Sequence, residues 1–415
     1  MFNPLPYEDP NFRMPFQCIW LKLNGSWPLE TVSSTHKPRN YLFALIYNIW
    51  AWYVIVSVGI TICFQTSFLL NNFGDIIMIT ENCCSTLMGA LNFVRLIHLR
   101  LNQRSFCELI KQFVVDIWIP DSKNASITKK CRKRMVTFQV MTILLSCLIL
   151  MYCVLPLVEL FYIVGTDVPV KPFPYKMVFP YDPYNSWIRY TLTYIFTAYA
   201  GICVVTTLFA EDSVFGFFTT YTCGQYRLLH KRIDVLVDKC KKNMSFGTNT
   251  EELNLKIIRE LQSISQHHNK IIRFAKRLED FFNPILLVNL MISSILICMV
   301  GFQLITSEYL FIGDYIKFIV YISSAISQLY ILCDNGDTLI QHSTITAWHL
   351  YNCKWEEISY NKEFLINLKY MILCSQRPVR ITAFKFSTLS LQSFTAILST
   401  SMSYFTLLRS IYFDK

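Results

Sequence analysis

The chain has 415 residues, of which 53% are hydrophobic and only 16% are charged, and its formal net charge is +10. Soluble globular domains carry about 25% charged residues, and the mean hydropathy of +0.36 also points away from a soluble protein. The basic excess does not indicate nucleic-acid binding, because the basic residues lie between hydrophobic runs and are not interleaved with stacking aromatics. These features predict an all-α, polytopic membrane protein.

The cysteines and histidines form no recognisable metal or redox motif. The fifteen cysteines contain no CxxC pair, and the seven histidines, which include His267-His268, contain no HExxH. The chain also lacks GxSxG, a glycine-rich phosphate loop and a paired-carboxylate constellation. We therefore expect free thiols, no metal, no cofactor and no enzymatic activity.

The chain begins with a polar segment, 1–40, and continues with seven apolar runs. The first segment contains several prolines and no charged start followed by an apolar core, so we expect a cytosolic segment and no cleaved signal peptide. Asp75, Glu81 and Asn82 make the second run the weakest, because acids in a span are usually paired or functional. The runs long enough to span a bilayer are Tyr41–Phe64, Phe73–Leu96, Val136–Phe161, Trp187–Ala210, Phe282–Ile305, Tyr315–Cys333 and Ile381–Ile411.

The last run contains no Gly or Pro, and Ser and Thr are spread evenly along it. As one helix it would be about 46 Å long at ~1.5 Å per residue, which exceeds the hydrocarbon core of about 30 Å. It is too polar to face lipid all round and too apolar for a soluble surface. This pattern predicts a helix that faces a pore or the interior of a bundle.

The basic residues of the connections predict the orientation. The connections after the second, fourth and sixth runs carry many Lys and Arg, whereas the alternate connections carry few. Because basic loops stay in the cytosol, the N-terminus is expected in the cytosol and the C-terminus outside. Three sequons then lie on the cytosolic side and should carry no glycan: Asn24, Asn124 and Asn243.

The connections also contain structured segments. Apolar residues recur at helical spacing from Glu251 into the fifth run, where Asn283-Pro284 predicts a bend, and Arg227–Lys242 continues the fourth run as a basic amphipathic helix. Such helices either form a bundle below the membrane, which their continuity with the spans favours, or lie on its surface. The segment Val168–Trp187 is rich in Pro and aromatic residues and predicts a lid over the outer surface or a compact loop.

Seven spans also occur in G-protein-coupled receptors, but that class is excluded. It requires an N-terminus outside, which contradicts the loop charges. Asn283-Pro284 also lacks the tyrosine of that family's motif, and no Asp-Arg-Tyr closes the third run.

A set of C-terminal residues forms a pattern that is weak residue by residue but specific in its order and position. The segment Phe179-Pro180-Tyr181-Asp182 in the outer loop agrees with it. The residues of the set are Cys333, Gly336, Ser343, Tyr351, Trp355, Ser375-Gln376-Arg377-Pro378, Thr382-Ala383, Phe386, Leu389-Ser390-Leu391, Phe394 and Ser403-Tyr404-Phe405-Thr406-Leu407-Leu408-Arg409. Over about the last fifth of the chain this pattern resembles the insect odorant receptor family.

The resemblance implies a ligand-gated, non-selective cation channel in the plasma membrane of olfactory sensory neurons. It implies a heterotetramer of a tuned subunit with a coreceptor subunit, and the short connection between spans four and five identifies this chain with the tuned subunit. Residues 41–333 would hold the spans and the odour pocket, 211–281 and 334–380 a cytosolic anchor, and 381–415 the pore helix and a short tail. A gustatory-type channel and a seven-span transporter remain alternatives.

The resemblance also implies two sites. A pore face and gate would use Thr400, Ser403, Leu407 and Ile411, although Leu407 and Ile411 also suit ordinary bundle packing. A pocket for small, volatile, apolar ligands would lie between spans two, three, four and six, where single aromatics also suit a structural core. Its candidate residues are Ile79, Thr80, Cys83, Ile149, Tyr152, Tyr194, Ala198, Phe318 and Tyr321.

Overall fold

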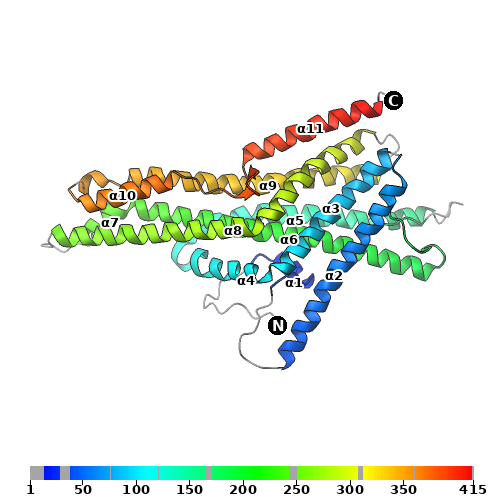
Figure 1. Cartoon of the computed structure of the whole chain (residues 1–415), viewed down its shortest axis with the longest axis horizontal. Coiled ribbons are helices and arrows are strands. Elements are labelled where there is room, and N and C mark those ends of the chain that lie inside the picture. Colours follow the sequence, from blue (N-terminus) through cyan, green and yellow to red (C-terminus); the bar gives the residue numbers. More distant parts are fainter. Residues whose placement is uncertain are drawn as a thin grey trace.

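The computed structural model describes residues 14–28, 38–74, 76–119, 121–163, 171–242, 250–306, 312–358 and 360–413. Within this part of the chain almost every element is a helix, and each predicted apolar run corresponds to one long helix (Figure 1). The all-α fold class with seven long helices is therefore confirmed. The long helices are α2 (Pro38–Asn71), α3 (Ile76–Leu101), α5 (Asp121–Ile163), α6 (Trp187–Asp234), α8 (Thr250–Thr306), α9 (Ile312–Tyr351) and α11 (Leu391–Phe413).

Short elements complete the described fold. In the described residues, α2, α5, α6, α8 and α9 are long and apolar enough to cross a membrane by length and composition. The helices α3 and α11 are more polar, α3 because it contains Glu81 and Arg95 and α11 because of its Ser and Thr residues. The short elements are α1 (Cys18–Leu23), α4 (Gln103–Gln112), a π-helical turn (Phe113–Ile117), α7 (Leu236–Lys242), a 3₁₀ turn (Trp355–Ile358), α10 (Lys362–Ser375), β1 (Thr382–Ala383) and β2 (Ser387–Thr388).

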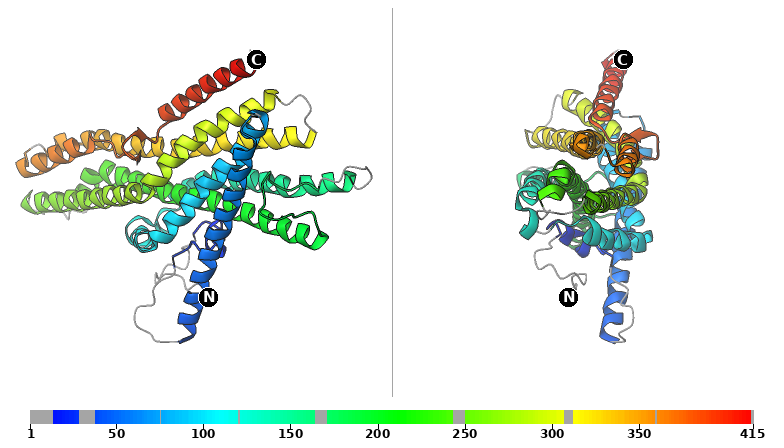
Figure 2. Two further views of the ribbon diagram at one scale, coloured as in Figure 1. Left: turned by 45° about the vertical axis from the view of Figure 1, so that its right-hand side comes forward. Right: turned by 90° about the vertical axis from the view of Figure 1, so that its left-hand side faces the viewer.

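The helix α6 is the centre of the bundle. It contacts α1, α2, α3, α5, α8 and α9, and every residue in 203–226 is buried. Its buried stretch also contains polar and charged residues, among them Glu211 and Asp212, and burial on all sides requires that these find partners inside the bundle. The other long helices are arranged around it, and α11 lies at one edge of the bundle in both views of Figure 2.

Three helices continue past their apolar runs. The helical patterns predict two of these extensions, those of α6 and α8, and the resemblance implies the third, that of α9. α8 is one uninterrupted helix of 57 residues, α6 is followed by α7 after a single residue, and α9 continues to Tyr351. These extensions and α10 run side by side away from the other helices (Figure 1). Pro284 lies inside α8, and Figure 1 shows this helix turning in its middle part. The segment 334–380 is therefore largely helical and packs against its neighbours.

One boundary in the sequence analysis is wrong. The run Ile381–Ile411 is not one helix, because β1 and β2 pair as an antiparallel hairpin before α11 begins at Leu391. Phe384 and Lys385 at its tip have φ of 53° and 59°, in the left-handed region that a right-handed helix excludes. Burial of apolar hairpin residues, including Ile381 and Leu389, stabilises the hairpin against the bundle.

The N-terminal segment also differs from a simple cytosolic tail. In its described part, α1 packs against α6, and Cys18 and Leu21 are buried there. Asn24 Nδ2 donates to the Thr206 and Thr207 hydroxyls, at 2.9 and 3.0 Å. Asn24 is therefore buried against α6 in the folded chain. Asn243 and Asp75 lie outside the described residues.

Candidate functional site

A small, partly open cavity lies between α2, α3, α5, α6 and α9, beneath the connection between α5 and α6. Its volume is about 50 Å³. Apolar side chains and two glycines form most of its wall, and none of the described lining residues is charged, so the cavity suits a small neutral molecule. The lining residues are Thr61, Ile62, Gln65, Ser85, Met88, Gly89, Leu148, Ile149, Tyr152, Tyr175, Thr197, Ala200, Gly201, Val204, Val205 and Tyr321.

The loop 171–186 covers this cavity. Val178 N–H donates to the Phe64 carbonyl at 3.2 Å, which fixes the loop on α2. Tyr175 reaches down from the loop and stacks on Tyr152 of α5, with 5.4 Å between the ring centroids. Burial raises the pKa of Tyr175 well above its ordinary value, so its hydroxyl stays neutral. The predicted lid therefore has a defined contact with the cavity.

The same loop pairs with an acidic residue of the second run. Lys176 Nζ lies 2.6 Å from Glu81 Oε2 on α3, and both side chains are partly exposed. Asn82 beside it donates to the Gln65 carbonyl of α2 at 3.1 Å. The polar residues that weaken the second run as a span thus join α3 to the loop and to α2.

The predicted pocket residues separate into two groups. Ile149, Tyr152 and Tyr321 line the cavity. Thr80 instead donates to the Ile76 carbonyl at 2.8 Å and accepts from Gln303 of α8. The Tyr194 hydroxyl donates to the Cys153 carbonyl at 2.5 Å. The remaining predicted residues that do not line this cavity are Ile79, Cys83, Ala198 and Phe318.

Helical register explains this separation, because one residue along a helix turns the side chain by about 100°. Ile79 and Cys83 share a face of α3, whereas the cavity uses the face of Ser85, Met88 and Gly89. Sequence reasoning also missed the contribution of α2, namely Thr61, Ile62 and Gln65, because the resemblance directed attention to four other spans. Two glycines inside apolar helices, Gly89 and Gly201, were a usable signal of close approach.

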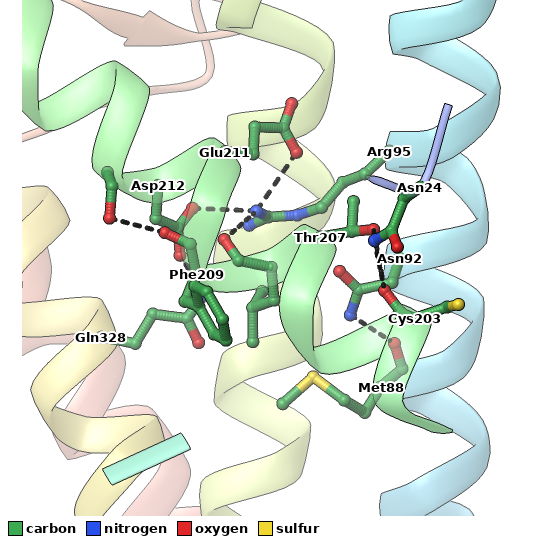
Figure 3. A network of polar contacts seen from close by, with 12 residues as sticks. Asn24, Met88, Asn92, Arg95, Cys203, Thr207, Phe209, Glu211, Asp212 and Gln328 are labelled. Carbon is green, nitrogen blue, oxygen red and sulfur yellow. Dashed lines mark hydrogen bonds and ion pairs between the residues drawn. The ribbon is translucent and has the colours of Figure 1, made fainter. Parts of the chain in front are cut away.

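Below the cavity, a buried ionic cluster connects three of its helices (Figure 3). Arg95 of α3 is fully buried, and its Nη1 lies 2.8 Å from Asp212 Oδ1 and 3.3 Å from Glu211 Oε2, both on α6. Gln328 of α9 donates to the second Asp212 oxygen at 2.7 Å. Because breaking a buried ion pair leaves an uncompensated charge, this cluster holds α3, α6 and α9 together.

The last helix has one packed face and one exposed face. Ser401 donates to the Ser294 carbonyl of α8 at 3.0 Å, and the rings of Phe394 and Tyr330 of α9 are 5.5 Å apart. The predicted pore residues are exposed, Leu407 at 56% and Ile411 at 50%, and so are Thr400 and Ser403. Their spacing of three and four residues puts all four on one face of α11, which points away from α8 and α9.

Other chemistry-bearing groups do not form a site in the described residues. No group of three or more His, Cys, Asp or Glu side chains there is arranged to hold a metal ion. All described cysteines are free thiols.

Comparisons with known proteins agree with this architecture. The model of the 7tm Odorant receptor family matches residues 75–402. Odorant receptor 13a of Drosophila melanogaster is 63% identical over 100% of this chain and 99% of its own length, and Odorant receptor 22c is 24% identical over 93% and 94%. The solved structure of olfactory receptor OR5 from Machilis hrabei, in complex with eugenol, has a TM-score of 0.78 at 17% identity, covering 95% of this chain and 97% of that one.

The long apolar helices and these relatives define a multi-pass membrane receptor rather than an enzyme. More specifically, the chain belongs to the odorant receptor family, because the family model and the 63% identical relative both cover most of it. The membership predicted from the C-terminal residues is thereby confirmed.

Proposed function

We propose that this odorant receptor is the tuned, odour-binding subunit of a heteromeric cation channel. The observation that carries the proposal is the pairing of an uncharged, mostly apolar cavity with a helix, α11, that keeps an exposed face of hydroxyl and apolar side chains. In an assembly around a central axis, Thr400 and Ser403 would offer hydroxyls to hydrated cations. Leu407 and Ile411 would form apolar rings that close the pore by dewetting.

The proposed orientation places the lid outside the cell and the N-terminus in the cytosol. Its support is the concentration of Lys and Arg in alternate connections. The cavity then lies in the outer half of the membrane, where a volatile ligand reaches it from outside or from the lipid. The plasma membrane of olfactory sensory neurons is the expected location, in contact with membrane lipids.

The helix α9 provides a mechanical link from the cavity to α11. Tyr321 of α9 lines the cavity, and Tyr330, further along the same helix, packs on Phe394 at the start of α11. A ligand larger than the 50 Å³ cavity must expand it. We propose that this expansion displaces α9, that α11 follows, and that the ring of Leu407 widens.

The proposed partner is the odorant-receptor coreceptor subunit, in a heterotetramer. The extensions of α6, α8 and α9, together with α10, would form the cytosolic anchor between subunits. Exposed apolar side chains on these elements support this role, and they include Trp348, Tyr351, Tyr370 and Leu373.

Current recording tests this proposal. The chain is expressed in cells with and without a coreceptor, and a panel of volatiles is applied under voltage clamp. We expect odour-evoked cation current only with the coreceptor. Current from this chain alone would support a gustatory-type channel instead, and saturable uptake without current would support a transporter.

A further inference from the structure

Most hydroxyl groups in the cavity wall are already committed to hydrogen bonds. Thr61, Ser85 and Thr197 donate to carbonyls of their own helices, at 2.7, 2.9 and 3.0 Å. Tyr321 donates to the Cys84 carbonyl of α3 at 2.9 Å. Since each hydroxyl has one proton, none of these four offers a donor to a ligand without breaking a bond to the protein.

Two cavity groups are different. Gln65 is 5% exposed, and no hydrogen bond joins its side-chain amide to another described residue. The Tyr175 hydroxyl likewise has no hydrogen-bond partner among the described residues. A polar group that lines a cavity without a protein partner can pair with a guest there, and one net hydrogen bond contributes about 0.5–1.5 kcal/mol, so a guest that pairs with these groups gains binding energy.

A glycine makes room for Tyr175. A Cβ added at Gly201 would lie 2.2 Å from the Tyr175 hydroxyl oxygen, so the end of this side chain rests over bare backbone on α6. Gln65 lies beside Gly89 of α3, where an added Cβ would be 3.8 Å from Gln65 Oε1, an ordinary contact distance. No larger residue at position 201 would leave Tyr175 in this place.

We propose that the Gln65 carboxamide and the Tyr175 hydroxyl are the hydrogen-bonding groups that this cavity offers to the oxygen of a small, neutral, otherwise apolar ligand. This inference rests on the proposed function and specifies its ligand chemistry. The carboxamide both donates and accepts, and the phenol donates and accepts as well, so the pair holds an alcohol or a carbonyl. The apolar remainder of the ligand contacts Ile62, Met88 and the other aliphatic walls.

The residues have distinct roles in this site. Gln65 and Tyr175 determine specificity for oxygenated ligands over hydrocarbons, because a hydrocarbon leaves both groups unpaired. The aliphatic residues contribute affinity that depends on chain length and not on oxygen. Charged ligands are rejected, since no described lining residue supplies a counter-charge.

The test uses the full channel, this chain with the coreceptor, in voltage-clamped cells. The probes are the straight-chain alcohols from pentanol to nonanol, with the ketones and alkanes of the same lengths. For the unmodified chain we expect each alcohol and ketone to be more potent than its alkane. Gln65→Met and Tyr175→Phe should each reduce that preference about fivefold, the factor that one net hydrogen bond of about 1 kcal/mol provides.

Tyr321→Phe is the matched control, because it removes a hydroxyl of the same cavity that is bonded to protein. It should change the potencies of alcohols and alkanes in parallel and leave their ratio unchanged. Cell-surface labelling of every variant verifies that it is present. The inference is overturned if Gln65→Met and Tyr175→Phe also shift alcohols and alkanes in parallel, or if the unmodified channel responds equally to both. Absence of any odour-evoked current with the coreceptor would instead overturn the proposed function.

Discussion

The cavity and the ionic cluster below it share the helices α3, α6 and α9 and differ in what their polar groups contact. At the cavity, Gln65 and Tyr175 line open space without a hydrogen-bond partner among the described residues. About two turns further along these helices, Arg95 is ion-paired with Asp212, which also accepts from Gln328, although Arg95 Nε and Glu211 Oε1 have no partner in the described part of the chain. The cavity therefore has room and hydrogen-bonding groups for a guest, whereas the ion pairs of the cluster join the helices to one another.

We infer from this difference that folding stability depends on the ionic cluster and that the response to ligands depends on the cavity. Substitutions at the cluster should lower the free energy of unfolding, because its buried charges cannot be solvated by water when they lose their partners. Substitutions at the cavity should change ligand potency and leave folding almost intact, because the cavity wall already contains empty volume. The predictions below test this separation, from the largest expected effect to the smallest.

Removing the cation of the cluster should have the largest effect. Arg95→Met leaves Glu211 and Asp212 buried without a counter-charge, which costs about 3–5 kcal/mol of folding free energy. Thermal unfolding of the purified channel in detergent measures this loss. Arg189→Met, at an exposed arginine on the same bundle, is the control.

A second variant separates charge from shape at the same cluster. Combining Arg95→Met with Glu211→Gln and Asp212→Asn removes all three charges and should restore most of the stability. If Arg95→Met unfolds at the same temperature as Arg189→Met, the cluster does not hold the helices and the proposed separation is wrong.

The gate comes next in expected effect. Leu407→Ala combined with Ile411→Ala should raise the basal current several-fold, because two apolar rings lose most of their bulk. Whole-cell current without odour measures it. Met402→Ala is the matched control, since Met402 is equally exposed but lies on another face of α11. Basal current that is unchanged in the double variant would contradict the assignment of the gate.

Two glycines of α6 allow the packed core and the cavity to be compared directly. A Cβ at Gly216 would lie 1.8 Å from the Phe138 ring in the packed core, so Gly216→Ala should cost about 1–3 kcal/mol of folding free energy. A Cβ at Gly201 meets the end of Tyr175 at the cavity, so Gly201→Ala should change agonist potency with little loss of stability. Thermal unfolding measures the stability of both variants, and dose–response curves measure their agonist potency. An equal loss of stability in the two variants would contradict the proposed separation of stability from ligand response.

The ion pair between the lid and α3 should have the smallest effect. Lys176 and Glu81 are both partly exposed, so solvent screens their attraction. Lys176→Met should therefore lower the folding free energy by no more than about 1 kcal/mol, and high salt should abolish the difference. Urea unfolding of the channel at low and high salt measures it.

The sequence predicted the long helices well because hydrophobic runs and helical stripes are local signals. The continuous α8, for example, follows from a periodicity that passes through Pro284. The hairpin before α11 was missed, because neither Gly nor Pro marks the left-handed residues Phe384 and Lys385. Phe384 and Lys385 are themselves exposed, so burial of the flanking Ile381, Ala383 and Leu389 selects the hairpin.

The site was harder to predict than the fold. Which helices surround a cavity depends on long-range packing, and which face of a helix points inward depends on its rotation. Ile149, Tyr152 and Tyr321 were predicted from their spans, which the resemblance names, and from their apolar and aromatic character, whereas Gln65 appeared to be an ordinary polar residue just after the first run. The proposed role of Tyr175 could not be predicted from the sequence, because it requires the loop to fold back over Gly201.

The separation of cavity and cluster rests on the smaller cavity being the ligand site, although a second and larger hollow exists. That groove, of about 340 Å³, lies between α5, α9 and Phe394 of α11, and exposed side chains such as Val140 and Tyr330 line it. The structure of the channel bound to a potent oxygenated agonist distinguishes the two places. We expect ligand density against Gln65, Tyr175 and Tyr321. Density in the groove beside Phe394, with the smaller cavity empty, would contradict the account.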